Sequence, residues 1–369
     1  VEVVKTLRRL KDIKGPKILH TCTVKGKGYA PAESDPTTWH APGKFNAETG
    51  ERPAKEYPAA RYQDVFGQVL CELAENDPRI VGITPAMATG SGMSDFAARF
   101  PDRFFDVGIA EEHAVTFAAG LAAGGMKPYC VIYSSFAQRA YDEIIHDIAL
   151  QRLNVVLCLD RAGLVGEDGA THQGAFDLAY LRCVPNTIIA APKDETQLKR
   201  LLYTGMNIKE GPFVIRYPRG LGEGTDWMKA GPEPMEIGKG ERLMDGEKVA
   251  VLALGPVANR AVEAAERLRE ETGTGPAIFN AIFLKPFDAA LLEEASHFKR
   301  IVTLEDGSLK GGLFSEVSEY VASRGLDIEV SGIGIPDRFI TQASVARQRE
   351  DCGLTTDRIY SELVELFQK

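Results

Sequence analysis

The most constraining feature of this 369-residue chain is the run FFDVGIAEEHAVTFAAGLAAGGM at residues 104–126. Residues 104–107 are apolar enough for a buried strand, and Gly108 lets the backbone turn before a helix begins near Ala110. The helix has little side-chain bulk, so we expect another backbone to approach it closely. A second copy packed across a two-fold axis would meet that need, which predicts a homodimer. The small residues are Ala114, Ala118, Ala119, Gly120, Ala122, Ala123, Gly124 and Gly125.

Two adjacent glutamates, Glu111 and Glu112, occupy the first turn of this helix. Acidic residues there ordinarily complement the helix dipole, an effect of ~0.3–1 kcal/mol on a surface. Here the flanking strand and helix are both apolar. A carboxyl group between them is expected to be partly desolvated, which favours a protonated form that can donate a hydrogen bond.

Strand and helix patterns alternate from residue 61 onward. Continuous apolar strands such as residues 127–133 and 154–160 need cover on both faces, as in a parallel sheet. The pattern therefore predicts a parallel-sheet α/β domain over residues 58–233, ending in a Gly- and Pro-rich linker at 220–234. The expected strands are 80–84, 104–107, 127–133, 154–160, 187–191 and 213–217, and the expected helices are 62–76, 94–100, 110–126, 135–151 and 195–202.

A smaller α/β domain is expected over residues 234–369. Asp245-Gly246 predicts a hairpin turn at its start. No pattern in this domain indicates catalysis. The expected strands are 248–254, 277–280, 300–305 and 327–333, and the expected helices are 259–271, 289–298, 313–324 and 357–367.

Residues 1–57 are interpreted as the tail of a third α/β domain followed by a linker. We expect a helix at 2–11, a strand at 17–24 and the glycine-punctuated turn KGKGY at 25–29. The Pro-rich region 30–58 contains His40, which in a loop is usually just solvated. Because the chain begins at Val1 in the middle of a helix pattern, we expect it to be a piece of a longer protein.

Composition excludes several classes of function. The net charge of -9 argues against nucleic acid as a partner, because the phosphate backbone would be repelled. The longest apolar stretch, within residues 114–126, is too short for a membrane span. Six cysteines without CxxC spacing indicate reduced packing residues, so we expect a cytoplasmic protein.

The loop at residues 161–174, RAGLVGEDGATHQG, is the strongest candidate for a functional segment outside residues 104–126. It follows the apolar strand 154–160, and ligands of open α/β sheets bind beyond the carboxyl ends of the strands. Its glycines and its polar residues Asp168, His172 and Gln173 are typical either of a mobile surface loop or of a ligand site on a rigid scaffold. The strand at 213–217 then delivers Arg216 and Arg219 in IRYPRG.

These runs, together with YSSFAQRAYDEIIHDIALQ and DRAGLVGEDGATHQGAFDLAYLR, resemble the 1-deoxy-D-xylulose-5-phosphate synthase family, thiamine diphosphate enzymes of the transketolase group. The resemblance covers essentially the whole chain. It implies a pyrimidine-binding domain followed by a transketolase C-terminal domain. It also implies a transferase that condenses pyruvate with glyceraldehyde 3-phosphate and releases CO2. The product, 1-deoxy-D-xylulose 5-phosphate, is a precursor for isoprenoid, thiamine and pyridoxal biosynthesis.

The resemblance also assigns residues to the cofactor. Glu111 matches the glutamate that hydrogen-bonds N1′ of the thiamine pyrimidine and favours the tautomer that activates the thiazolium carbon. Phe136 matches the aromatic residue packed on the pyrimidine, and Tyr29 matches a cofactor-contacting tyrosine. His40 and His172 match active-site histidines.

The remaining matches concern the loop and the second substrate. Asp168 lies in the same loop as His172. Tyr133, Arg139, Arg161 and Arg219 match the group that binds the phosphorylated acceptor. Arginine suits this role because its planar fork can make two charge-assisted hydrogen bonds to phosphate at once.

One departure is the absence of the family's Mg²⁺-binding GDG motif with its later asparagine, because GEDG at residues 166–169 is interrupted by Glu167. We therefore predict no metal ligands in this chain, and we expect Mg²⁺ and the diphosphate to be bound by an upstream segment of the same protein. Three alternatives stay open: a transketolase, the β subunit of a 2-oxoacid dehydrogenase, and a non-catalytic relic.

Overall fold

The computed structural model describes residues 2–36, 38–40, 42–53 and 57–368. The chain divides into two compact units, Val1–Tyr57 and Pro58–Lys369. None of the helices in these described ranges is long and apolar enough to cross a membrane.

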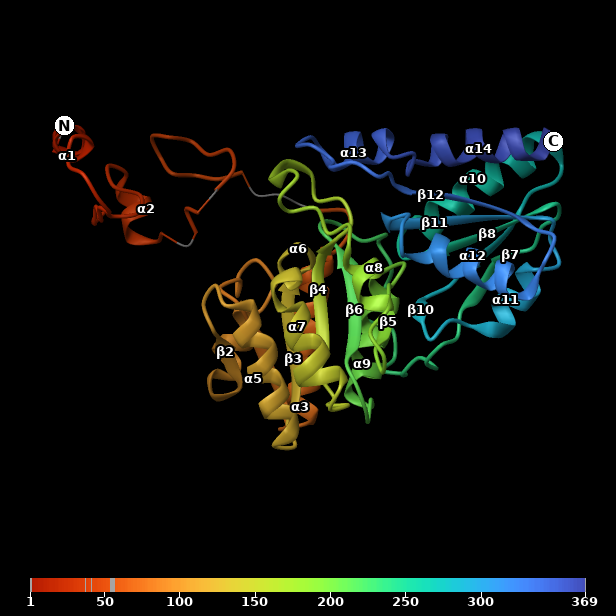
Figure 1. Cartoon of the computed structure of the whole chain (residues 1–369), viewed down its shortest axis with the longest axis horizontal. Helices are drawn as coiled ribbons and strands as arrows, with labels where there is room; N and C mark the ends of the chain where they lie inside the picture. Colours follow the sequence, from red (N-terminus) through yellow and green to blue (C-terminus); the bar gives the residue numbers. More distant parts are fainter. Residues whose placement is uncertain (1, 37, 41, 54–56, 369) are drawn as a thin grey trace. The chain divides into compact units, whose positions relative to one another are not determined.

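The first unit has two helices, α1 (Glu2–Lys11) and α2 (Ala30–Ser34), drawn in red in Figure 1. α1 confirms the helix expected at 2–11. The strand expected at 17–24 is wrong: residues 17–24 carry no strand, because no strand of the described chain pairs with them and a lone strand leaves its backbone groups to water. Within the expected linker, Pro31 in the first turn of α2 supports a short helix.

The second unit is built on a seven-stranded sheet in the order β10-β5-β6-β4-β3-β1-β2. Every neighbouring pair is parallel except β10 with β5, which confirms the predicted parallel sheet. Tyr133 of β3 pairs with Asp160 of β4 at the carboxyl end. The strands are β1 (Ile80–Thr84), β2 (Phe104–Asp106), β3 (Lys127–Tyr133), β4 (Val156–Ala162), β5 (Ile188–Ala190), β6 (Phe213–Pro218) and β10 (Phe283–Lys285).

Helices cover both faces of this sheet, as the apolar strands require. Two core clusters form, one on each face: α3 (Tyr62–Asn76), α4 (Ser94–Arg99) and α9 (Glu195–Met206) contribute to one, and α5 (Glu111–Ala123) and α8 (Asp177–Arg182) to the other. The helix expected at 135–151 is broken into α6 (Ser134–Ala137), a 3-10 turn (Gln138–Ala140), α7 (Tyr141–Glu143) and a π-helical turn (Ile144–Ala149).

The small residues of α5 serve this chain's own packing first. Ala114, Ala118 and Ala119 are buried, and α5 packs on β3. The close backbone partner predicted for this part of the helix is therefore the sheet of the same chain. Gly120, Ala123 and Gly124 remain exposed on the outer side.

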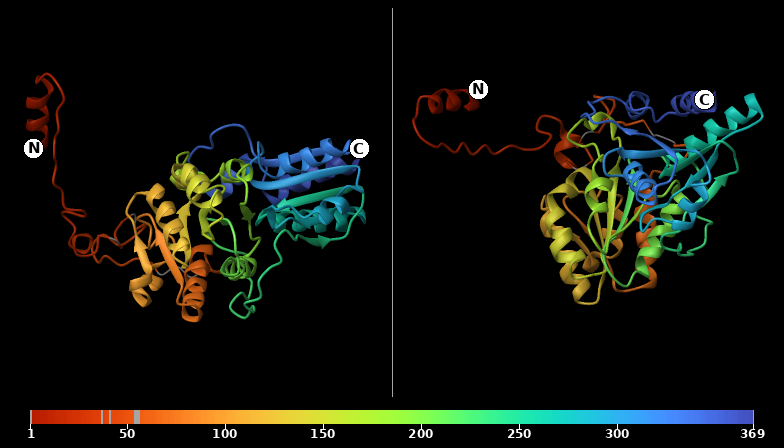
Figure 2. Two further views of the ribbon diagram at one scale, coloured as in Figure 1. Left: turned by 60° about the horizontal axis from the view of Figure 1, so that its bottom comes forward. Right: turned by 45° about the vertical axis from the view of Figure 1, so that its right-hand side comes forward.

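A five-stranded sheet follows in the order β12-β11-β8-β9-β7, coloured from cyan to blue in Figure 2. The predicted hairpin is wrong, because β7 pairs antiparallel with β9 and not with β8. Gly246 instead allows a close approach, since a Cβ there would lie 2.0 Å from the backbone carbon of Pro276. The strands are β7 (Glu241–Met244), β8 (Val249–Leu254), β9 (Ala277–Asn280), β11 (Arg300–Ser308) and β12 (Glu329–Ile335).

Five helices accompany this sheet: α10 (Val257–Thr272), α11 (Ala289–Ala295), α12 (Leu313–Arg324), α13 (Val345–Asp351) and α14 (Thr356–Gln368). Sequence patterns did not predict α13 or β10. β10 comes from the C-terminal part of the chain yet pairs with β5 of the larger sheet. The two sheets are therefore joined by backbone hydrogen bonds as well as by the linker.

Candidate active site

The candidate residues of the second unit gather beyond the carboxyl ends of the parallel strands. Glu111 follows β2, Tyr133 ends β3, Arg161 lies at the end of β4 and Arg219 follows β6. This edge of an open parallel sheet is where ligands bind, because strand ends and helix N-termini converge there.

Glu111 is buried at the start of α5, with 2% of its surface exposed, whereas Glu112 is exposed. Glu111 is therefore buried between the strand and the helix, and the two glutamates differ because consecutive helical residues point in different directions. The carboxylate is not isolated, however. Its Oε1 accepts a hydrogen bond of 2.6 Å from Nη1 of Arg139, whose own side chain is half exposed.

Three aromatic side chains continue from this pair. The Arg139 guanidinium lies 4.8 Å from the centre of the Phe136 ring. Phe136 stacks on Tyr133 at 5.7 Å and meets His172 edge-on at 5.2 Å. These side chains form one continuous series of contacts that comes from α5, β3, the helical stretch after β3 and the loop at 161–174. Its members are Glu111, Arg139, Phe136, Tyr133 and His172.

Arg161 extends this chain from β4. Its guanidinium lies 3.9 Å from the centre of the Tyr133 ring, donates to Asp160 Oδ2 at 2.5 Å and donates to the Gly90 carbonyl at 3.1 Å. Arg161 has φ of 59°, a left-handed conformation that costs a non-glycine residue ~1–2 kcal/mol. Local strain of this kind is concentrated at functional sites.

Asp160 pairs with the Arg161 guanidinium. It is fully buried, and one of its two oxygens, Oδ1, has no hydrogen-bond partner among the described residues. Burial raises the pKa of Asp160 to about 6, although the Arg161 guanidinium opposes this shift.

Arg219 is held by the loop. It donates to the Val165 carbonyl at 2.6 Å and to Asp168 Oδ2 at 3.0 Å, with Glu167 at 3.5 Å. The resemblance groups Arg139 with Arg161 and Arg219, but the structure pairs each of the three with a different carboxylate. An incoming phosphate would compete with those carboxylates for the guanidinium donors.

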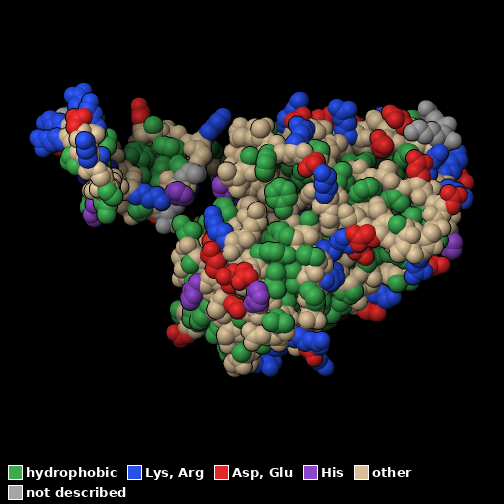
Figure 3. Space-filling model, viewed as in Figure 1, with side chains coloured by type: hydrophobic (Ala, Val, Ile, Leu, Met, Phe, Trp, Pro, Cys, Tyr) green, Lys and Arg blue, Asp and Glu red, His purple; other side chains and the backbone are tan. Residues whose placement is uncertain are grey.

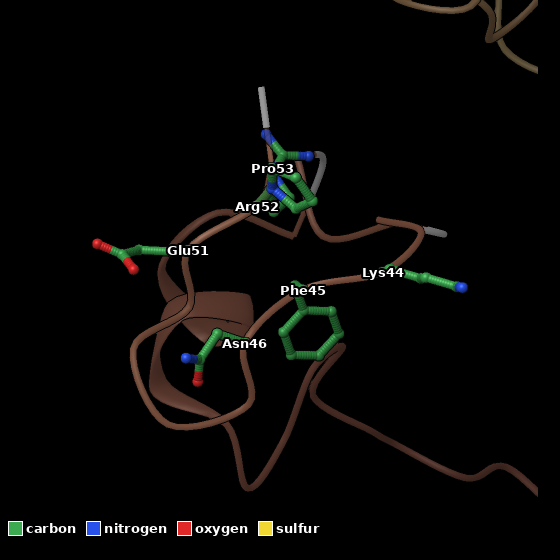
Figure 4. Close-up of a pocket in the computed structure, with 6 residues that line it drawn as sticks. All are labelled: Lys44, Phe45, Asn46, Glu51, Arg52 and Pro53. Atoms are coloured by element: carbon green, nitrogen blue, oxygen red, sulfur yellow. The ribbon is translucent and has the colours of Figure 1, made fainter. Parts of the chain in front are cut away.

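Tyr29 and His40 lie in the first unit. Tyr29 packs against Trp39 at 5.0 Å and Phe45 at 5.7 Å, and its hydroxyl is buried without a partner in the described part of the unit. His40 is exposed. The same unit has an open hollow lined by Lys44, Phe45, Asn46, Glu51, Arg52 and Pro53, with Glu51 and Lys44 directed away from it (Figure 4).

Sequence reasoning missed Asp160 and Gly90, which bond Arg161. It also missed Asp306 of β11 and Gln348 of α13, which hold the loop at 161–174. Asp160 had a signal, since a carboxylate directly after an apolar strand and before an arginine is unusual. The other three had none, because nothing in their own neighbourhood indicates what they contact.

No three His, Cys, Asp or Glu side chains in the described residues are arranged to hold a metal ion. Of the six cysteines, Cys71, Cys130, Cys158 and Cys352 are buried as expected of packing residues. Cys22 and Cys183 are exposed.

Two family models match the second unit. Residues 59–224 match the family model "Transketolase, pyrimidine binding domain", and residues 238–359 match "Transketolase, C-terminal domain". A solved structure described as "Split gene transketolase, inactive beta4 tetramer" is 32% identical with a TM-score of 0.74, over 84% of this chain and 98% of that one. The chain therefore belongs to the transketolase family.

Within that family, the similar curated proteins carry one name. The 1-deoxy-D-xylulose-5-phosphate synthases of Parabacteroides distasonis and Bacteroides thetaiotaomicron are each 53% identical over 98% of this chain. The matched regions make up 57% and 56% of their own lengths. The synthase of Thermosynechococcus vestitus is 47% identical over 99% of this chain and 58% of its own length. The chain thus spans somewhat more than half the length of these relatives.

Proposed function

We propose that this chain forms the pyrimidine-side and acceptor-side part of a thiamine diphosphate-dependent transferase. In this proposal the enzyme condenses pyruvate with D-glyceraldehyde 3-phosphate, releases CO2 and yields 1-deoxy-D-xylulose 5-phosphate. The observation that carries the proposal is the buried Glu111 carboxyl at the start of α5. Arg139 links it to Phe136 and so to His172, and Tyr133 continues the contacts to Arg161. About 50% identity to synthases over nearly the whole chain supports the choice of substrates.

The residues present fit the pyrimidine end of the cofactor. A buried carboxyl group can pair with a ring nitrogen, and the partly exposed Phe136 ring offers a surface for an aromatic ligand. The half-exposed Arg139 can leave Glu111 for another partner without unfolding its helix. When bound, thiamine diphosphate supplies a thiazolium carbon that stabilises negative charge on the acyl group left by decarboxylation.

The loop and strand ends fit a phosphorylated aldehyde. Arg161 and Arg219 supply charge-assisted donors for the phosphate. We assign His172 and Asp168 to the reacting end of the acceptor, where a histidine can hold or deliver a proton. Tyr133 fixes the Arg161 guanidinium by stacking.

The proposal includes partners. An upstream segment of the same protein would bind the diphosphate through Mg²⁺. The bound cofactor would then contact Tyr29 and lie near His40. We divide the chain into residues 1–57, 58–233 and 234–369 for these roles. A homodimer in the cytoplasm is the proposed assembly, formed through the outer face of α5. Acidic and histidine side chains gather over α5 and α7 on that side (Figure 3).

Proton exchange at the thiazolium carbon tests the central assignment. In the complete enzyme, Glu111→Gln should abolish the exchange of the C2 proton followed by NMR, because the amide cannot take the role of the buried acid. The matched control is Glu112→Gln, an exposed neighbour with the same chemical change, which should keep the wild-type exchange rate. Equal loss in both variants would contradict the assignment.

Substrate choice separates this function from that of a transketolase. Product formation from pyruvate and glyceraldehyde 3-phosphate, with CO2 released in equal amount, supports the synthase. Transfer of a two-carbon unit from a ketose phosphate with no use of pyruvate would refute it. We also expect the 369-residue chain alone to bind thiamine diphosphate poorly in calorimetry, and the upstream segment with Mg²⁺ to restore binding.

A further inference from the structure

The loop at residues 163–174 is closed at its neck and held from behind. Gly163 and Gly174 exchange two backbone hydrogen bonds of 2.7 and 2.8 Å, so the segment leaves β4 and returns to the same point. Inside the loop, backbone bonds connect Gly169 to Gly166 and His172 to Gly169. These few internal bonds leave much of the loop's backbone to be satisfied by other groups.

Three consecutive backbone N–H groups are satisfied by side chains. The N–H of Leu164 donates to Asp306 Oδ1 at 3.2 Å, that of Val165 to Gln173 Oε1 at 2.8 Å, and that of Gly166 to Gln348 Oε1 at 2.8 Å. Asp306 belongs to β11 and Gln348 to α13. Two of the three acceptors therefore come from the C-terminal sheet and its helices.

Gln348 makes the most complete of these contacts. Its side chain is buried, with 1% exposed, and its amide group both accepts from the Gly166 N–H and donates to the Gly166 carbonyl at 3.1 Å. It also donates to the Thr341 carbonyl at 2.9 Å. Only a carboxamide offers an acceptor and two donors on one rigid plane, so neither glutamate nor methionine can reproduce this set.

The loop's glycines fit the same surface. A Cβ at Gly163 would lie 2.1 Å from Asp306 Oδ2, and one at Gly166 would lie 2.9 Å from the Val345 side chain. The backbone of the loop can approach the C-terminal sheet this closely because both positions lack a side chain. Glycine at positions 163 and 166 therefore allows the loop to pack closely against β11 and α13.

We propose that Gln348 is a positioning residue through which the C-terminal domain fixes the conformation of residues 163–174. Its side-chain hydrogen bonds in the described structure go to Gly166 and Thr341, and none goes to Asp168 or His172. It acts through the Gly166 peptide, which lies at the start of the turn that carries Asp168 and next to the Val165 carbonyl that holds Arg219. The catalytic consequence of this role rests on the proposed function, but the conformational role does not.

Amide hydrogen exchange on the full chain tests the conformational role. Gln348→Glu keeps the shape and one acceptor but removes both donors, so exchange across residues 163–174 should become roughly 10- to 100-fold faster. Exchange in β8 reports whether the C-terminal sheet is intact and should not change. Gln68→Glu, the same chemical change on the exposed side of α3, is the matched control and should leave the loop at its wild-type rate.

A second variant, Gln348→Met, removes every polar atom without adding charge and should give the same localised change. Unchanged loop exchange in both variants overturns the proposal. Faster exchange in β8 in both variants also overturns it, because Gln348 would then support the whole domain and not the loop.

Kinetics of the complete enzyme adds the functional readout. Gln348→Glu should raise the apparent KM for glyceraldehyde 3-phosphate about 10-fold or more with little change in the KM for pyruvate, because the Arg219 partner moves with the loop. A loosened loop with unchanged acceptor KM would refute the placement of the acceptor in the proposed function while the positioning role stands. Equal rises in both KM values with an unchanged loop would overturn the positioning role.

Discussion

Removal of the Arg216 guanidinium should destabilise the fold far more than removal of an exposed arginine. Arg216 and Asp177 are both almost fully buried, with 4% and 1% of their side chains exposed. Arg216 donates to both Asp177 oxygens, at 2.7 and 3.2 Å, and to the Asp306 carbonyl at 2.8 Å. It therefore connects β6 of the seven-stranded sheet, the helix α8 and β11 of the five-stranded sheet.

The expected cost follows from what is left behind. Arg216→Met removes the only cation bonded to the buried Asp177 in the described structure, and breaking a buried ion pair on one side costs ~3–5 kcal/mol. Arg267→Met is the control, because Arg267 pairs with Glu271 and Asp357 on the surface, where such pairs are worth ~0–1 kcal/mol. The predicted difference is thus about 2–5 kcal/mol.

Urea unfolding followed by circular dichroism measures both variants. The double variant Arg216→Met, Asp177→Leu should recover part of the loss, because it leaves no buried charge without a partner. If Arg216→Met costs no more than Arg267→Met, or if the double variant is no more stable than Arg216→Met, the pair is not the buried ion pair that its geometry indicates.

Three further predictions concern pH, assembly and substrate. Burial raises the pKa of Glu305 to about 7, against 4.5 for an ordinary glutamate, so the folded state keeps a proton that the unfolded chain releases in this window and stability falls as pH rises through it. Glu305→Gln should flatten this slope by up to about 1.4 kcal/mol per pH unit in urea titrations between pH 4.5 and 7, and an unchanged slope would contradict the assignment. Gly120→Phe, at a position where an added Cβ would meet no atom within 4 Å beyond its own stretch of helix, should weaken dimers of the complete protein in ultracentrifugation without lowering its melting temperature; an unaffected dimer would exclude this face. Arg161→Ala or Arg219→Ala should weaken acceptor binding by ~1.5–3 kcal/mol per charged hydrogen bond lost, seen as a higher KM for glyceraldehyde 3-phosphate. A selective loss of pyruvate affinity would give the arginines another role.

Much of the fold could be predicted because its signal is local. Residues 62–76, 80–84 and 127–133 coincide with α3, β1 and β3, since each combines a complete period with a clear stop at a turn or a change of pattern. The three-residue β10 and the seven-residue α13 are too short for a period to develop. The strand expected at 17–24 failed for another reason: strand propensity says nothing of whether a partner strand is present.

The site was predictable where chemistry follows an element boundary. Glu111 opens the helix that follows β2 and Arg161 lies at the end of β4, and both positions are beside the edge of a parallel sheet where ligands bind. Their pairing could not be predicted. The sequence is equally compatible with Arg139 binding the phosphorylated substrate or pairing with Glu111. The short helical turn after β3, which breaks the expected continuous helix, directs Arg139 toward Glu111.

The motif IRYPRG contains two arginines, Arg216 and Arg219, whose different roles cannot be told apart from the sequence. The alternation of β6 directs Ile215 and Tyr217 into one core cluster and Val214 into the other, so Arg216 must enter the apolar interior on the Val214 side. It is tolerated there only because Asp177 and the Asp306 carbonyl come from two other elements to meet it. Arg219 lies just past the end of the strand, so the in-and-out alternation of strand side chains does not direct it into a core. It contacts the loop that Gln348 holds. The buried Arg216 thus joins the two sheets, and the half-buried Arg219 depends on that junction. A substitution at Arg216 should therefore disturb the acceptor site through the fold, and one at Arg219 should disturb it directly.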